Sequence, residues 1–195
     1  MPKIVAFLHL TLDGVMQGPG RAGEDCRDGF EHSGWAAPYS DGAMSRTVSQ
    51  SMANAGALLF GRRTYEDFYR VWPSRTDNPF TPILDNALKY VASRTLDHSL
   101  PWMNSQLLRG DAEDTVATLR AQPGKDVIIL GSGLLVQSLL RRNLVDEMIL
   151  TIHPIVLGSG RRLFPDRGPT APLRLVSSET TSTGGMIATY QPATT

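Results

Sequence analysis

The sequence contains little cysteine, no excess of either charge and no long apolar run. Its single cysteine, Cys26, cannot form a disulfide within the chain, which favours a reducing compartment. Nineteen basic and nineteen acidic residues cancel, so charge gives no indication of nucleic acid or an anionic membrane as partner. The apolar run near the N-terminus is too short to span a bilayer and lacks a signal-peptide cleavage pattern. We therefore expect a soluble cytoplasmic protein that binds neither nucleic acid nor membrane.

Metal and thiol chemistry are not indicated either. The four histidines are scattered along the chain without the spacing of metal ligands, so no metal site is predicted. His153, in the segment ILTIHP, is interpreted as a strand residue rather than a ligand. Cys26 lies in a loop rich in glycine and acids with no evident base, so we expect no catalytic thiol.

The residues that are present predict a packed α/β protein. A length of 195 residues and an apolar content of 41% are sufficient for one domain, residues 1–195, with a real core. The hydrophobic patterns alternate between strands and helices, which indicates a mostly parallel central sheet flanked by helices. The expected strands are 3–10, 55–60, 88–92, 126–130 and 147–156, and the expected helices are 41–54, 64–69, 111–121 and 134–142.

Three further segments complete this expected architecture. Residues 173–183 and 186–190 are predicted to form a C-terminal antiparallel hairpin with a two-residue turn at Gly184-Gly185. Residues 73–82 are interpreted as turns. Residues 13–34 contain many glycines and are expected to form a long mobile loop, and loops of that length in compact domains are often functional.

Glycines, hydroxyls and arginines follow three of the predicted strands. The segments are Gly61-Arg62-Arg63-Thr64, Ser93-Arg94-Thr95 and Gly131-Ser132-Gly133. If the strands are parallel neighbours, these segments gather at the carboxyl edge of the sheet, where ligands of α/β proteins bind. Helix N-termini, glycine backbone and arginine side chains all suit a phosphate group. The combination predicts a nucleotide site.

Each segment also has an ordinary structural explanation. Thr64 and Asp67 have the spacing of a capping box, which satisfies a helix without any ligand. Ser93-Arg94-Thr95 has the composition of a solvated turn. The third glycine of a GxGxxG motif is replaced by Val136, so the late glycine segment alone is a weak dinucleotide signal. Asp111, with Asp114 three residues on, is predicted to be the N-cap of a helix.

At this point the motifs resemble a known family. The segment GRxTY at residues 61–65, followed in order by SRT and a glycine cluster, resembles the dihydrofolate reductase fold. The stretch 127–164, with LVDE at 144–147 and PIVLG at 154–158, is similar to the reductase domain of riboflavin biosynthesis proteins, the RibD C-terminal domain. LDG at residues 12–14 is similar to the same branch.

The resemblance implies an NADPH-dependent reductase of a pterin- or aminopyrimidine-like heterocycle, commonly a homodimer. By position, Ser93 and Arg94 would meet the 2′-phosphate of NADPH, and His9 and Met16 would line its nicotinamide. The other positions that the resemblance assigns to the cofactor are Gly61, Arg62, Thr64, Gly131, Ser132, Gly133, Leu134 and Val136. Asp13 is the candidate catalytic residue at the mouth of the site.

The substrate site is less defined by the resemblance. Phe30 and Trp35 are candidates for substrate contact, with core or dimer packing as the alternative. Asp41 is the candidate anchor, and Asp13 has the alternative role of a simple turn residue. Dihydrofolate reductases carry an acidic residue on the helix before the GRxT strand, and the corresponding place here is near Ser45. The alternative function is therefore a non-catalytic nucleotide-binding or regulatory module.

Overall fold

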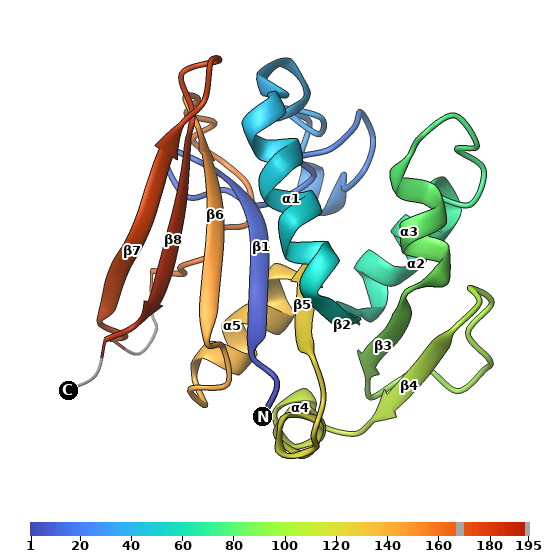
Figure 1. Ribbon diagram of the computed structural model, residues 1–195. Helices are drawn as coiled ribbons and strands as arrows, with labels where there is room; N and C mark the ends of the chain where they lie inside the picture. The colour runs from blue at the N-terminus through green and yellow to red at the C-terminus, as the bar shows by residue number, and fades with distance from the viewer. Residues whose placement is uncertain (167–169, 194–195) are drawn as a thin grey trace. The chain divides into compact units, whose positions relative to one another are not determined.

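The computed structural model describes residues 1–166 and 170–193 (Figure 1). Its internal contacts divide the chain into two compact units. Unit 1 consists of Met1–Val5 and Asn54–Val145, and unit 2 consists of Ala6–Ala53 and Asp146–Thr195. The expectation of one domain over residues 1–195 stays a prediction.

Unit 1 is built on four parallel strands. In spatial order they are β4 (Ser105–Arg109), β3 (Leu88–Ser93), β2 (Ala55–Gly61) and β5 (Asp126–Leu130). The centres of β2 and β5 are almost fully buried, as expected for parallel strands that are covered on both faces. Beside β5 lies the start of the chain, where the Val127 N–H donates to the Lys3 carbonyl at 2.8 Å.

Four helices cover these strands. They are α2 (Arg62–Val71), α3 (Phe80–Asn86), α4 (Ala112–Ala121) and α5 (Gly133–Leu140). Helix α2 packs on β2 and β3, while α4 packs on β3, β4 and α5. Under α2 the rings of Phe60, Tyr65 and Trp102 pack together, and the Tyr65 hydroxyl accepts a hydrogen bond from the Trp102 N–H at 3.0 Å.

Unit 2 has the strand order β1-β6-β8-β7. Its strands are β1 (Ile4–Thr11, of which Ala6 onwards belongs here), β6 (Glu147–His153), β8 (Met186–Pro192) and β7 (Leu173–Thr180). The pairs β6–β8 and β8–β7 are antiparallel. The α/β class, with mostly parallel strands and a C-terminal antiparallel hairpin, is thus confirmed. Helix α1 (Gly42–Asn54) completes the unit.

The glycine-rich segment after β1 is anchored within unit 2. It contains the short 3-10 helices Arg27–Gly29 and Ala37–Tyr39. Val15, Phe30 and Trp35 are buried together against the apolar side chains of Ile155 and Leu157. Val15 also forms a bridge with Arg162, so this segment is fastened to the chain that follows β6.

Several expected boundaries and elements are wrong. Helix α2 begins at Arg62 with Gly61 as N-cap, so Thr64 lies inside the helix and the predicted Thr64–Asp67 capping box does not form. Strand β6 ends at His153 rather than at residue 156. The hairpin turn is longer than two residues, since β7 ends at Thr180 and β8 begins at Met186.

One α-helix and one strand were also absent from the expectation. Helix α3 lies partly in the segment 73–82, whose Asn78, Pro79 and Pro82 led to the interpretation as turns. The Asn78 side chain accepts a hydrogen bond from the Phe80 N–H at 2.9 Å, at the start of the helix. Prolines are compatible with a first helical turn, so they did not exclude a helix. Strand β4 is short and half exposed, and its polar sequence SQLLR carries little of the apolar alternation that marks a strand.

Candidate functional site

The three segments that follow β2, β3 and β5 lie at one edge of unit 1. In the parallel register Gly61 lies opposite Ala92, so the ends of β2 and β3 are level. The Gly61 N–H donates to Ser132 Oγ at 3.0 Å, and Arg62 Nη1 donates to Thr95 Oγ1 at 3.1 Å. The expected gathering of these segments is therefore confirmed. We call residues 61–64, 93–95 and 131–133 the strand-end edge.

Two helices begin at the strand-end edge without a side-chain cap. The N-cap of α2 is Gly61, which has no side chain, and the N-cap of α5 is Ser132, whose side chain does not bond to its own helix. Gly131 and Ser132 have φ values of 59° and 52°, which turn the chain sharply from β5 into α5. Uncapped helix N-termini present unpaired N–H groups and partial positive charge, which together favour an anion.

Two arginines of this edge, Arg62 and Arg94, are paired with carboxylates near the surface. Arg62 Nε lies 2.7 Å from Glu66 Oε1, one helical turn along α2. Arg94 Nη1 lies 3.4 Å from Asp111 Oδ1, and the two side chains are 77% and 60% exposed. Asp111 is the N-cap of α4 as predicted, but its side chain does not cap the helix. Ion pairs as exposed as these contribute little free energy, so a ligand anion can replace the carboxylate.

The remaining cofactor candidates of unit 1 differ in exposure and in the hydrogen bonds that they already make. Ser93 Oγ accepts hydrogen bonds from the N–H groups of Thr95 and Leu96, which closes a local turn. Leu134 is 51% exposed at the start of α5, whereas the side chain of Val136 is fully buried. A Cβ atom on Gly131 would lie 3.6 Å from the methyl group of Thr64, so these two positions are neighbours.

Asp13, in unit 2, is held by the fold on several sides. Its carboxylate accepts from Thr11 Oγ1 at 2.6 Å and from the N–H groups of Leu157 and Gly158 at 3.2 and 2.9 Å. Partial burial raises the pKa of Asp13, but these hydrogen bonds outweigh it and bring the pKa to about 2. Arg162 also lies 3.6 Å from the carboxylate. The contacts are those of a turn residue, and the catalytic role stays a prediction.

Asp41 is engaged in a similar way. Its carboxylate accepts from the Ala43 N–H at 2.5 Å, at the start of α1, and from the N–H of Ser182 at 2.8 Å, in the hairpin turn. The Ser182 hydroxyl bonds to the same oxygen, and these hydrogen bonds lower the pKa of Asp41. Asp41 therefore links α1 to the turn between β7 and β8.

Phe30 and Trp35 are 5% and 6% exposed. Trp35 Nε1 donates to the Gln17 carbonyl at 2.7 Å, so both the apolar ring and its polar atom are accommodated within unit 2. The packing interpretation of these two residues therefore agrees with the structure, and substrate contact stays a prediction.

His9 forms a pair that the sequence did not indicate. His9 Nδ1 lies 3.0 Å from His153 Nε2, and the two rings stack with centroids 5.2 Å apart. Trp35 and Tyr39 also pack against the His153 ring. Burial, with the nearby His153 ring, lowers the pKa of His9 to about 4, and burial lowers the pKa of His153 to about 4. Both rings are therefore neutral at pH 7.

Sequence reasoning did not identify several side chains that contact the predicted site residues, and the roles of those residues stay predictions. Glu66 stands four residues after Arg62, a spacing that indicates an ion pair once both residues lie on one helix, but the expected helix begins at residue 64 and the observed one at Arg62. Asp111 and His153 contact their partners only because of the tertiary structure. Met16, a nicotinamide candidate, is fixed through its backbone, with its N–H donating to the Arg161 carbonyl at 2.8 Å.

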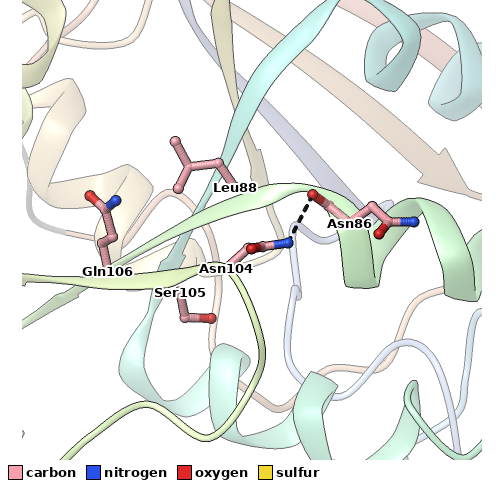
Figure 2. Close-up of a pocket in the computed structure, with 5 residues that line it drawn as sticks. All are labelled: Asn86, Leu88, Asn104, Ser105 and Gln106. Atoms are coloured by element: carbon pink, nitrogen blue, oxygen red, sulfur yellow. Dashed lines mark hydrogen bonds between the residues drawn. The ribbon is translucent and has the colours of Figure 1, made fainter.

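A depression of about 400 Å³ lies elsewhere on unit 1 (Figure 2). It is lined by Asn86, Leu88, Asn104, Ser105 and Gln106, at the amino ends of β3 and β4. The strand-end edge is at the carboxyl ends of the strands, so this depression does not belong to it. Asn104 Nδ2 donates to the Asn86 carbonyl at 3.2 Å, and no charged side chain lines the depression.

In residues 1–166 and 170–193, none of the helices has the length and hydrophobicity that crossing a bilayer requires. Within the same ranges, no three His, Cys, Asp or Glu side chains lie close enough to share a metal ion. The absence of a metal site stays a prediction.

Comparison with known proteins agrees with the resemblance expected from the motifs. A model of the RibD C-terminal domain family matches residues 2–187. YyaP, an uncharacterized protein of Bacillus subtilis (strain 168), is 28% identical over 195 residues, which cover 96% of this chain and 94% of YyaP.

Two solved structures show the same fold. A putative riboflavin biosynthesis protein from Shewanella sp. PV-4 has a TM-score of 0.69 at 22% identity, over 98% of this chain and 99% of that one. The dihydrofolate reductase of Enterococcus faecalis, in a complex with NADP(H), has a TM-score of 0.64 at 13% identity, over 98% and 97%. The fold is therefore dihydrofolate reductase-like.

Proposed function

Because the chain belongs to the RibD C-terminal domain family, we propose that it is an NADPH-dependent reductase. In this proposal its substrate is a pterin- or aminopyrimidine-like heterocycle, such as an intermediate of riboflavin synthesis. The observation that carries the proposal is the strand-end edge of unit 1. There two uncapped helix N-termini and two arginines, Arg62 and Arg94, lie at the ends of neighbouring parallel strands.

The strand-end edge fits the phosphates of a dinucleotide. In the proposal the N-terminal N–H groups of α2 and α5 donate to the pyrophosphate oxygens, with Gly61 and Gly131 leaving room for the backbone to approach and Thr64 helping to hold the phosphates. Ser132 Oγ, which accepts from the Gly61 N–H, holds the two helix starts in position. Gly133 and Leu134 open α5 beneath the cofactor.

Arg94 gives the proposed preference for NADPH over NADH. Its side chain is 77% exposed, and among the residues that the structure describes its ion-pair partner is the exposed Asp111. A 2′-phosphate offers it shorter, charge-assisted hydrogen bonds than that 3.4 Å pair. Arg62 is more firmly held, by Glu66 and Thr95, and in the proposal it faces the adenosine phosphates.

The chain's own part in the reduction is to orient cofactor and substrate and to exclude water, since bound NADPH supplies the hydride. In the proposal His9 and Met16 contact the nicotinamide. The neutral state of His9 suits this role, because a cation there would oppose the positive charge that the nicotinamide gains. With a pKa of about 2, Asp13 is ionised at pH 7. In the proposal it therefore helps to hold the substrate and does not donate a proton to it.

A non-catalytic nucleotide-binding module is the second candidate. It is favoured by Asp41, whose carboxylate is occupied by Ser182 and Ala43, and by the absence of an acid near Ser45. The helix α1 thus offers no unoccupied carboxylate at the place where dihydrofolate reductases bind the pterin ring.

Two measurements on the full chain test the proposal. Titration with NADPH and NADH, followed by nicotinamide fluorescence, should give a blue shift and at least about tenfold tighter binding of NADPH, about 1.4 kcal/mol. Loss of NADPH absorbance is then followed with a panel of pterins, aminopyrimidines and quinones. No binding at millimolar NADPH would reject the function. Binding without oxidation across the panel would select the non-catalytic module.

A further inference from the structure

A pair of histidines joins two neighbouring strands of unit 2. His9 is on β1 and His153 ends β6, and these strands are adjacent in the strand order (Figure 1). The atoms His9 Nδ1 and His153 Nε2 are 3.0 Å apart, and the two ring planes are inclined by 27°. The contact is therefore a hydrogen bond, in which one ring donates and the other accepts.

Each ring of this pair has one proton to place. Both imidazoles are neutral at pH 7, and a neutral imidazole carries a proton on one nitrogen and a lone pair on the other. If His9 donates from Nδ1, His153 carries its proton on Nδ1, and His9 Nε2 is an acceptor. If His153 donates from Nε2, His153 Nδ1 keeps a lone pair, and His9 Nε2 carries a proton. The surroundings of His153 Nδ1 thus decide what His9 offers to a ligand.

In the described part of unit 2, nothing accepts a proton from His153 Nδ1. The residue is 1% exposed, and its ring packs against the rings of Trp35 and Tyr39. Its ring makes one hydrogen bond to the described residues, the one with His9. Thr151 lies two residues earlier on the same face of β6, and its buried hydroxyl has no partner among those residues. A buried N–H group without an acceptor is rarer than an unused lone pair, so His153 carries its proton on Nε2.

His9 is therefore an N–H donor at Nε2. Its Nδ1 accepts from His153, so its own proton is on the other nitrogen, which points away from His153. Among the described residues this second nitrogen has no hydrogen-bond partner. His9 is partly exposed, whereas His153 is buried, so His9 is the member of the pair that a ligand can reach.

We propose that His153 is a positioning residue, which fixes the tautomer and the orientation of the His9 ring so that His9 Nε2 donates to the carboxamide oxygen of the nicotinamide. This role rests on the proposed function, in which His9 contacts the nicotinamide. The family resemblance supplies neither a role for His153 nor a direction for the hydrogen bond. The ligand group that fits His9 Nε2 is a carbonyl oxygen, and an amide N–H group does not fit it.

The first experiment locates the protons in the ligand-free full chain. Proton–nitrogen correlation spectra of the isotope-labelled protein at pH 7 show which nitrogen of each histidine carries a proton, and glutamine variants of the individual histidines assign the signals. His9 and His153 should both carry it on Nε2, with a scalar coupling from His153 Nε2 to His9 Nδ1 across the hydrogen bond. A proton on Nδ1 of either ring would overturn the proposal.

The second experiment identifies the nicotinamide group that His9 contacts. The full chain is titrated with NADP⁺, with its thionicotinamide analogue, in which sulfur replaces the carboxamide oxygen, and with its acetylpyridine analogue, which keeps the oxygen and lacks the amide N–H groups. Sulfur is a weak acceptor, so the thionicotinamide analogue should bind about three- to tenfold more weakly than NADP⁺. The acetylpyridine analogue should bind within about twofold of NADP⁺. The reverse order would mean that His9 accepts from the amide, and the proposal would fail.

Variants of His153 separate positioning from packing. His153→Gln keeps an amide N–H that can donate to His9 Nδ1, so it should preserve the ratio of the thionicotinamide and NADP⁺ dissociation constants. His153→Leu removes the donor, and the ratio should fall toward unity. An unchanged ratio in His153→Leu would remove the positioning role. His98→Leu is the matched control, since His98 is 62% exposed in unit 1 and pairs with Asp97.

The outcomes distinguish this proposal from the proposed function. If neither NADP⁺ nor its analogues bind, both fail. If NADP⁺ binds but a proton is on Nδ1 or the analogues bind in the reverse order, the role of His153 fails and the reductase proposal stands. If His153→Leu does not fold, as judged by circular dichroism, the proton positions and the analogue order of the wild type still decide the proposal.

Discussion

In unit 1, two arginines at the strand-end edge, Arg62 and Arg94, contact other side chains. Arg94 meets Asp111, and Arg62 meets Glu66 and Thr95. In unit 2, the polar groups around Asp13 contact the backbone of their own fold, with Leu157 and Gly158 donating to the carboxylate. A side chain that accepts hydrogen bonds from backbone N–H groups in a turn or in the interior is needed for folding. An exposed ion pair adds little stability, so one of its partners can be replaced by a ligand. Perturbing both regions should therefore separate stability from binding.

The largest effect is expected from Trp35→Ala. Trp35 is 6% exposed and its Nε1 donates to the Gln17 carbonyl, so truncation should lower the free energy of unfolding by about 3–5 kcal/mol. Trp35→Phe retains most of the packing and should cost about 1–2 kcal/mol. Denaturant unfolding measures both. Unchanged stability in Trp35→Ala would contradict the packing role of Trp35.

Asp13→Ala should come next. Loss of the acceptor leaves the Leu157 and Gly158 N–H groups and Thr11 Oγ1 without this partner, and should cost about 2–3 kcal/mol of unfolding free energy. The control is Asp97→Ala, whose side chain is 91% exposed and whose loss should have no measurable effect. If Asp13→Ala abolishes turnover while stability is unchanged, the residue is catalytic rather than structural.

The His9–His153 pair should make unit 2 sensitive to acid. Both pKa values lie near 4, below the usual 6.5. Between these values the unfolded chain binds more protons than the folded chain, so stability is fully present above pH 6.5 and falls as pH drops toward 4. The loss should be roughly 1–3 kcal/mol in denaturant unfolding at pH 7 and pH 4.5. His153→Gln should flatten this dependence, and an equally steep profile in that variant would contradict the assignment.

Arg94→Ala should affect binding and not stability. NADPH affinity should fall about tenfold or more, about 1.4 kcal/mol, while NADH affinity is unchanged. Arg63→Ala is the matched control, because Arg63 is the exposed neighbour of Arg62 and has no assigned role. Fluorescence titration measures all three proteins. Equal losses for NADPH and NADH would reject the 2′-phosphate contact.

The smallest effect is expected from Asp111→Asn. Removal of the negative charge frees Arg94 from its 3.4 Å ion pair, so NADPH affinity should rise by about two- to threefold with no change for NADH. Asparagine is as good an N-cap residue as aspartate, so α4 should remain intact. A fall in NADPH affinity would mean that Asp111 positions Arg94 rather than competing for it.

Much of the fold was readable because its strands are strongly apolar. The runs 55–60 and 126–130 lie within one residue of β2 and β5, since buried parallel strands have few polar positions to obscure them. Strand β4 and helix α3 were missed because SQLLR and the proline-rich start of α3 have weak patterns of their own. Both form because the neighbouring β3 and Trp102 pack against them, which local propensity does not contain.

For the candidate site, the sequence by itself determined which residue types follow each strand, and with them the three segments of the strand-end edge. It also determined the family, because the motifs occur in order along nearly the whole chain. Only the tertiary structure decided the partners. Asp13 and Asp41 accept hydrogen bonds from backbone N–H groups, and Arg94 forms an ion pair with Asp111. His9 contacts His153, which lies on a strand far along the chain. The physical reason is that hydrogen bonding and burial depend on which segments the folded chain brings within about 3 Å, and no local pattern encodes that distance.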